Sequence, residues 1–228
     1  MGLTSNESPI KRYFVAILYQ KFFFHCLTPP VLSGSSMDPS KIISAIILSG
    51  GLGSRMGQQE KGLIDRNGKP LVSYVIDQLS AQVDDITLNC NRHIDLYEKL
   101  GYSVITDNMA DFQGPLAGVQ ASLSHVNHGL CLIAPCDTPS LPADLVSRLY
   151  QALIETDSDI AYPICGNRKH YIPSLIRKDL LRSLNNYLET GKRSIRGWYS
   201  NQKVKEVDFS GSEQSFINVN TPQLLASI

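Results

Sequence analysis

A glycine-rich segment that contains a cation, with a second cation just beyond it, carries the clearest chemical signal in the sequence. The run Ser49–Gly57 (SGGLGSRMG) includes Arg55, and Lys61 follows it closely. Glycines permit unusual backbone angles and let main-chain N–H groups approach phosphate oxygens. Two cations beside such donors match the charge of a triphosphate. We therefore expect the backbone at Gly50 and Gly51, together with Arg55 and Lys61, to bind nucleotide phosphates.

The glycine spacing excludes two common phosphate-binding motifs. No GK[ST] sequence closes the segment, so it is not a Walker A loop. Gly51, Gly53 and Gly57 are spaced GxGxxxG, and no ribose-binding acid follows a second strand about twenty residues later, which excludes the dinucleotide fingerprint. A tight turn with two solvated charges is the structural alternative. The position of the segment directly after the most apolar run of the chain favours ligand binding.

A single carboxylate follows another apolar run. Asp137 comes directly after Ile133–Cys136 (IAPC) and precedes Thr138 and Pro139. Magnesium in a nucleotide site needs only one or two protein carboxylates, because phosphate oxygens and waters complete its octahedron. An Asp that forms a turn before a proline is the structural alternative. With the glycine segment upstream, we expect Asp137 to hold Mg²⁺, and we interpret Cys136 as a small buried thiol.

Polar side chains also follow the next two predicted strands. Asn89 carries both a donor and an acceptor, which suits recognition of a base edge or ribose hydroxyls. Asn91 is predicted to cap the helix that follows it. Asp107 ends a strand, and Gly114–Pro115 begin a helix whose N–H groups would point outward at a ligand.

The elements that must position these residues alternate along the chain. The β-branched apolar run at 42–48 is typical of a strand buried on both faces. Further strands are predicted at 85–88, 103–106, 130–134, 159–163 and 204–207, and helices at 70–82, 93–100, 115–125, 142–155, 178–189 and 221–227. This alternation indicates a three-layer α/β/α fold with a mostly parallel central sheet. Parallel sheets bind ligands at the carboxyl ends of their strands, which is where the candidate residues lie.

Length and composition limit the number of domains and the kinds of partner and site that the chain can have. A chain of 228 residues is long enough for one sizeable domain, which we place at 41–228. Equal numbers of basic and acidic side chains, 21 of each, give no reason to expect a nucleic-acid partner. The five cysteines are odd in number and lack CxxC spacing, which argues against a disulfide framework or a zinc site and favours the cytoplasm.

Residues 1–40 differ from the chain that follows. An aromatic and apolar stretch at 14–32 is interrupted by Gln20 and Lys21 and ends at Pro29–Pro30, so it is too short and too broken to span a bilayer. In order of preference, we interpret 1–40 as an upstream extension from a start codon set too early, a poorly ordered tail, or an export signal. In the first case Met37 is the natural start. Export is disfavoured because an exported enzyme would meet no NTP.

The motifs together resemble a known family. The run LSGGLGSRMGQQEKGL at 48–63 resembles the GGxGxRM…K loop of the glycosyl-1-phosphate and cofactor nucleotidyltransferases, which have a Rossmann-like fold. Four more motifs resemble the molybdenum cofactor guanylyltransferase family: NCNR at 89–92, DFQGPLAG at 111–118, APCDTP at 134–139 and NVNTP at 218–222. The likeness runs from about 43 to the C-terminus. Ser49 departs from the usual Ala, and HYIPS at 170–174 departs from His-Pro-Thr, so His170 receives no role.

The resemblance implies roles for individual residues. GTP would contact Leu48, Ser49, Gly50 and Lys61, and the nucleotide pocket would include Asn89 and Asp107. Asp137 would bind both GTP and Mg²⁺. The asparagines of the late loop, Asn218 and Asn220, would lie near molybdopterin.

The implied reaction is magnesium-dependent transfer of GMP from GTP to the phosphate of molybdopterin, with pyrophosphate as the leaving group. Transient contact with molybdenum cofactor carrier or acceptor enzymes is expected, and no membrane partner. Alternatives are cytidylyl transfer to molybdopterin or a sugar-alcohol phosphate, and a non-catalytic nucleotide-binding regulator. A dehydrogenase is a third option, which the glycine spacing disfavours.

Overall fold

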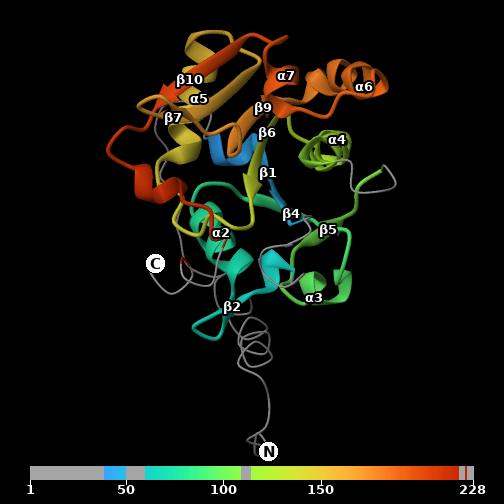
Figure 1. Ribbon diagram of the computed structural model, residues 1–228, viewed down its shortest axis with the longest axis vertical. Helices are drawn as coiled ribbons and strands as arrows, with labels where there is room; N and C mark the ends of the chain where they lie inside the picture. Colours follow the sequence, from blue (N-terminus) through green and yellow to red (C-terminus); the bar gives the residue numbers. More distant parts are fainter. Residues whose placement is uncertain (1–38, 50–59, 109–113, 221–223, 225–228) are drawn as a thin grey trace, which may run out of the picture.

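One twisted sheet organises the molecule (Figure 1). The computed structural model describes residues 39–49, 60–108, 114–220 and 224. Within these residues eight strands form the central sheet, in the order β10 (Val204–Asp208), β7 (Ile160–Cys165), β9 (Ser174–Arg177), β6 (Leu130–Pro135), β1 (Ile43–Leu48), β4 (Asp85–Asn89) and β5 (Ser103–Ile105), with β8 (Arg168–Lys169) paired to β7. A separate hairpin joins β2 (Asp65–Arg66) to β3 (Lys69–Pro70).

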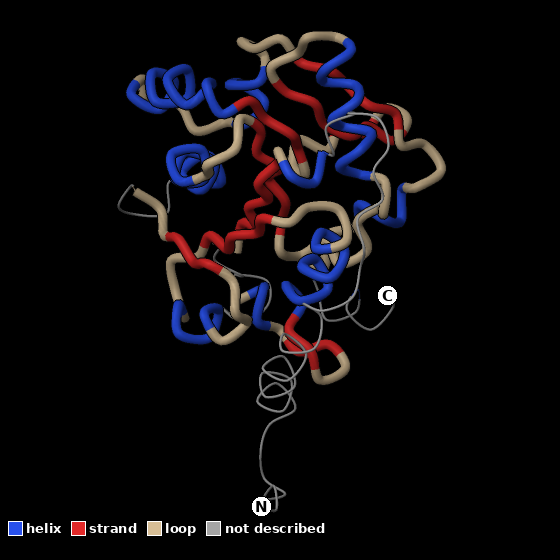
Figure 2. Tube along the Cα trace, turned by 180° about the vertical axis from the view of Figure 1, so that it is seen from behind, coloured by secondary structure: helices blue, strands red, loops and turns tan. Residues whose placement is uncertain are grey.

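Helices cover both faces of this sheet, as Figure 2 shows from behind. One apolar cluster joins the sheet to α2 (Leu71–Ser80), α3 (Ile94–Glu98) and α5 (Leu145–Glu155). A second cluster joins the opposite face to α4 (Pro115–His125), α6 (Leu181–Glu189) and α7 (Ile195–Tyr199). Short 3₁₀ turns complete the described elements: η1 (Pro39–Lys41), η3 (Lys61–Leu63), η4 (Lys178–Leu180) and η5 (Glu213–Phe216).

Strand β1 is buried on both sides, as its sequence predicts. Ile43, Ala45 and Ile47 belong to the first apolar cluster and Ile46 to the second, and all four side chains are fully buried. Side chains of a strand alternate between the two faces of a sheet, so a continuous apolar run supplies both cores at once. The central place of β1 in the sheet follows from this burial.

The strands around β1 end together at one edge. β1 is parallel to both β4 and β6, and Leu48 is level with Asn89 on one side and with Pro135 on the other. The residues that follow these three strands therefore emerge next to one another. This register brings three of the candidate segments to a common edge.

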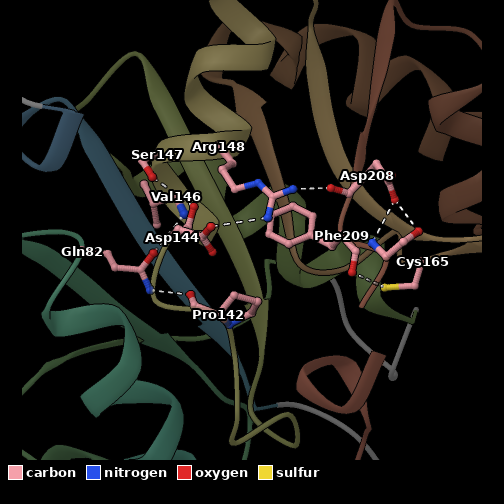
Figure 3. A network of polar contacts seen from close by, with 10 residues as sticks. Gln82, Pro142, Asp144, Val146, Ser147, Arg148, Cys165, Asp208 and Phe209 are labelled. Atoms are coloured by element: carbon pink, nitrogen blue, oxygen red, sulfur yellow. Dashed lines mark hydrogen bonds and ion pairs between the residues drawn. The ribbon is translucent and has the colours of Figure 1, made fainter. Parts of the chain in front are cut away.

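On one flank, a network of polar contacts anchors the start of α5 (Figure 3). Gln82, just after α2, donates to the carbonyl of Pro142 at 3.0 Å and accepts from the amide of Val146 at 3.0 Å. Arg148 pairs with Asp144 at 3.4 Å, and its guanidinium also lies over the ring of Phe209. These contacts join α2, α5 and the segment after β10 into one flank of the molecule.

The prediction of a mostly parallel sheet between helix layers is confirmed, although several elements were not predicted. β9 is antiparallel and lies between β6 and β7. The short β8, the hairpin β2–β3 and helix α7 were also missed. The predicted helix at 178–189 is a 3₁₀ turn followed by α6, and the predicted terminal helix at 221–227 falls almost wholly outside the described residues. Among the described helices, none has the length and apolar character needed to cross a membrane.

Candidate active site

A cavity of about 360 Å³ opens at the edge where β1 and β6 end. Its lining comes from segments far apart in the sequence: Leu48, Ser49, Lys61, Pro115, Pro135, Cys136, Asp137, Ile172 and Asn218. The residues after strands converge here because parallel strands present their carboxyl ends together. Pro115 is the first residue of α4, so the helix N-terminus faces the same space.

The main polar feature of the cavity is a contact between a cation and a carboxylate. Lys61 Nζ lies 3.2 Å from Asp137 Oδ2, and the Asp137 side chain is only 10% exposed. The same ammonium donates to Asn220 Oδ1 at 2.5 Å. Lys61 begins η3, whereas Asp137 directly follows the end of β6 and Cys136. The sheet therefore brings together two charged groups separated by 76 positions in the chain.

Backbone and side-chain bonds fix the late loop against Asp137. The amide of Val219 donates to the carbonyl of Asp137 at 2.7 Å. Thr138 Oγ1 donates to Asn218 Oδ1 at 3.1 Å. Asn218 consequently lies in the cavity lining, and Asn220 contacts Lys61.

A second polar group lies beside the cavity, where β4 and β5 end. Asn89 donates to Asp107 Oδ1 at 3.0 Å, and Asn91 donates to Asp107 Oδ2 at 2.8 Å. Asn91 also accepts from the Asp107 amide at 2.8 Å. Asn89 and Asp107 do not line the described cavity; they are joined to it through the amide of Ser49, which donates to the Asn89 carbonyl at 2.7 Å.

The predicted cap at Asn91 is wrong. Helix α3 begins at Ile94, and its N-cap is His93, which has a left-handed backbone with φ 53° and makes no side-chain cap bond. The helix starts later than the sequence pattern suggested, so Asn91 is left free to bind Asp107 on both its carboxylate and its amide. Asn91 therefore helps to hold Asp107 in place and does not cap helix α3.

The interpretation of Cys136 as a buried thiol is confirmed. The residue is 6% exposed, and burial raises the pKa of its thiol far above the ordinary value of 9.0. A thiol that stays protonated is a weak nucleophile. Cys136 therefore contributes a small apolar wall beside Asp137.

The remaining candidates divide into those that the structure describes and those that it does not. Leu48, Ser49, Lys61, Asp137 and Asn218 line one cavity. Gly50, Gly51 and Arg55 lie outside the described residues. The lining also includes Pro115, Pro135, Cys136 and Ile172. Of these, Pro115 was predicted to face a ligand from its place at a helix start, whereas Ile172 was given no role.

Most of the chain matches a model of a known protein family. The model described as "MobA-like NTP transferase domain" matches residues 45–206. The fold and the site thus define a nucleotidyltransferase.

Two curated relatives and one solved structure narrow the class. The molybdenum cofactor guanylyltransferase of Shewanella frigidimarina is 39% identical over 79% of this chain and 92% of its own. That of Shewanella piezotolerans is 37% identical over 79% of this chain and 89% of its own. The chain belongs to the molybdenum cofactor guanylyltransferase family. Molybdopterin-guanine dinucleotide biosynthesis protein A from Archaeoglobus fulgidus, at 25% identity, covers 81% of this chain and 95% of its own with a TM-score of 0.67, which confirms the predicted fold class.

Proposed function

We propose that the protein transfers GMP from GTP to the phosphate of molybdopterin and releases pyrophosphate. Membership of the family supports the reaction class. The observation that carries the chemistry is the approach of Lys61 Nζ to Asp137 Oδ2, 3.2 Å apart at the edge of the cavity. A cation and a carboxylate held together at a strand-end cavity suit a metal-bound triphosphate. The cation can bind the negative phosphates, and the carboxylate can bind the positive metal ion.

In this reaction a terminal phosphate oxygen of molybdopterin attacks the α-phosphorus of GTP in line. The bond from the α-phosphorus to the oxygen that bridges it to the β-phosphorus breaks, and pyrophosphate leaves with those electrons. Nucleotidyl transfer depends mainly on positioning and charge neutralisation. A phosphate acceptor is already anionic near neutral pH, so the protein needs no general base.

Lys61 would neutralise the leaving phosphates, together with Arg55 and the backbone at Gly50 and Gly51. The ammonium is well placed because its side chain spans from η3 to both Asp137 and Asn220. A lysine binds phosphate as a compact point charge with several donors, which tolerates movement of charge toward pyrophosphate.

Asp137 would hold Mg²⁺, which when bound supplies charge neutralisation at the α-phosphate. The donor set fits this ion, because Mg²⁺ in a nucleotide site needs only one or two protein carboxylates. A single nearly buried carboxylate beside a cavity suits a cation that keeps waters and substrate phosphates around it.

The two polar groups around the cavity would orient the substrates. Asn89 and Asp107, tied together at 3.0 Å, would bind the nucleoside of GTP, and Asn218 and Asn220 would face molybdopterin. Leu48 and Ser49 would contact the nucleotide between them. Dependence on NTP assigns the reaction to the cytoplasm in this proposal.

Pyrophosphate release tests the proposal directly. The purified chain is incubated with GTP or CTP, with and without molybdopterin, and with Mg²⁺ or EDTA. Release should require GTP, molybdopterin and Mg²⁺ together. Equal release with CTP would favour a cytidylyltransferase, and nucleotide binding without release would favour a regulator.

Variants of the charged pair test the residue roles. Asp137→Ala should abolish turnover while the fold persists. Lys61→Ala should lose about 10- to 150-fold in kcat/KM, the equivalent of one charged contact worth about 1.5–3 kcal/mol. Asp157→Asn is the matched control, since the side chain of Asp157 is 87% exposed and pairs with Arg177 and Lys203 instead. A near-normal rate in Asp137→Ala would remove the metal assignment.

A further inference from the structure

A second buried carboxylate, that of Glu60, lies next to Lys61 in the chain, and the proposed mechanism does not use it. Among the described residues the buried carboxylates are those of Asp137 and Glu60, each 7% exposed. Glu60 Oε2 lies 2.9 Å from Nη2 of Arg92. The Glu60 side chain is 4% exposed and that of Arg92 31%, so the acid is enclosed and its partner reaches solvent.

The position of this ion pair links the two polar groups of the site. Glu60 directly precedes Lys61, and Arg92 directly follows Asn91, which binds Asp107 at 2.8 Å. The pair therefore joins the segment that carries the phosphate-side lysine to the segment that carries the nucleoside-side amides.

Both chain neighbours of Lys61 are held by the region that follows β4. Glu60 is held through Arg92. On the other side, Gly62 packs so closely on the hydroxyl of Tyr97 in α3 that an added Cβ would overlap it. Tyr97 is itself fully buried. Held on both sides in this way, the backbone of Lys61 is fixed, and its side chain reaches Asp137 and Asn220.

Stability alone does not account for such a pair. Burial raises the pKa of the Glu60 carboxyl above its ordinary value of 4.5, although Arg92, His93 and Tyr97 act to lower it. Enclosing the charge is thus unfavourable in net effect, and replacing a buried ion pair by apolar groups is often neutral or stabilising. A positional role gives a reason for charge at this place.

We propose that the Glu60–Arg92 ion pair is a positioning device that fixes the backbone of Lys61, so that its ammonium meets the phosphates of the bound nucleotide. This inference rests on the proposed role of Lys61. Glu60 and Arg92 touch no reacting atom and act through the lysine. A lysine misplaced by about 1 Å costs on the order of 100-fold in rate, because its charge no longer follows the leaving group.

A double-mutant cycle separates this role from a structural one. Glu60→Gln and Arg92→Met are each made in the parent chain and in Lys61→Ala, and kcat and KM for GTP are measured from pyrophosphate release. In the parent chain, each change should lower kcat by about 10- to 100-fold with a smaller change in KM. In Lys61→Ala the same changes should cost less than about twofold, because the group they position is already gone. Arg92→Lys, which keeps the charge, should recover part of the loss.

A folding defect is excluded by a further variant. A Glu60→Gln/Arg92→Met chain contains no unpaired buried charge, so its thermal stability should stay close to that of the parent while kcat remains low. Glu206→Gln is the matched control: Glu206 pairs with Lys169 at 2.6 Å on the edge strand, and kcat should not change.

The outcomes distinguish this inference from the proposed function. Equal losses in the parent and Lys61→Ala backgrounds, or a double variant with normal kcat, would overturn the positioning role and leave the role of Lys61 intact. A normal rate in Lys61→Ala itself would overturn both.

Discussion

Gly118 illustrates how a single residue can matter to a site because it has no side chain. It lies in α4, and a Cβ added to it would lie only 2.7 Å from Asn89 Oδ1 and 2.9 Å from Leu48 Cδ2. Contacts this short force the neighbours to move. The helix can approach the ends of β1 and β4 because residue 118 is glycine.

Gly118→Ala should therefore displace Asn89 and raise KM for GTP, with a smaller effect on kcat. Overpacking costs about 1–3 kcal/mol of stability, of which the better helix propensity of alanine returns up to about 1 kcal/mol. Steady-state kinetics and urea denaturation measure the two effects. Gly129→Ala is the control, since an added Cβ there meets nothing within 4 Å. A variant at 118 with unchanged KM would show that Asn89 does not contact the nucleotide.

His170 gives a prediction for stability against pH. The residue is 9% exposed and its ring packs on Phe216 with centroids 4.8 Å apart. Burial, with a smaller effect of Arg168, lowers the pKa of the imidazole below its ordinary value of 6.5. The unfolded chain therefore binds more protons than the folded one just below that value, and folding loses stability as pH falls through 6.5.

Replacing the titrating ring should flatten this dependence. Urea denaturation of the parent between about pH 7 and about pH 5 should show a steeper decline in unfolding free energy than denaturation of His170→Gln. His125→Gln, which replaces the exposed last residue of α4, is the matched control. Parallel slopes for parent and His170→Gln would contradict the buried, neutral state of His170.

At the scale of elements, the sequence predicted best where one local signal decided the structure. The helix predicted at 115–125 matches the bounds of α4, and Pro115 accounts for its start because proline suits a first helical position. β9 was missed because its four residues, Ser174–Arg177, carry little periodicity, and pairing with both β6 and β7 decides their conformation. Helix α7 was missed because Gly197 interrupts a short run, and Ser194 supplies the cap by accepting from the Gly197 amide.

In the candidate site, too, part of the arrangement could be predicted from the sequence and part could not. Lys61 and Asp137 could be expected to meet because both come after strands predicted to be parallel, and they do approach each other. The enclosure of Glu60 could not be foreseen, since a charged residue that follows a glycine-rich segment is ordinarily solvated. Only the fold brings Arg92 to Glu60 and Tyr97 to Gly62.

Gln82 provides the element-scale prediction. Helix α5 has Asp144 as N-cap without a side-chain cap bond, and Gln82 instead accepts from the amide of Val146 in its first turn. Gln82→Ala should therefore lower the free energy of unfolding by about 1–2 kcal/mol, as the loss of a helix cap does. KM and kcat should stay unchanged, because α5 lies away from the cavity lining. Gln151→Ala, which removes only an exposed bond to Glu155, should cost less than about 0.5 kcal/mol in the same denaturation series.

At the scale of the whole molecule, the sheet assembles a site from segments that share no local structure. The cavity draws on residues from Leu48 to Asn218 along the chain. The formal net charge is zero, so the molecule as a whole gives little long-range attraction to a triphosphate. Affinity must then come from the local cations and backbone donors at the strand ends. A bound nucleotide would add contacts between segments that are far apart in the chain.

Nucleotide binding should consequently stabilise the entire fold. GTP with Mg²⁺ at about 100 times its Kd should add about 2.7 kcal/mol of stability and raise Tm by about 5–10 °C for a chain of this size. Thermal unfolding followed by circular dichroism, with GTP, CTP or no nucleotide, measures the shift. Lys61→Ala should show a smaller rise at the same GTP concentration, whereas Gln82→Ala should start from a lower Tm and show the full rise, because its defect lies outside the cavity. The same rise with CTP as with GTP would contradict guanine selectivity, and no rise with either would contradict nucleotide binding at this edge of the sheet.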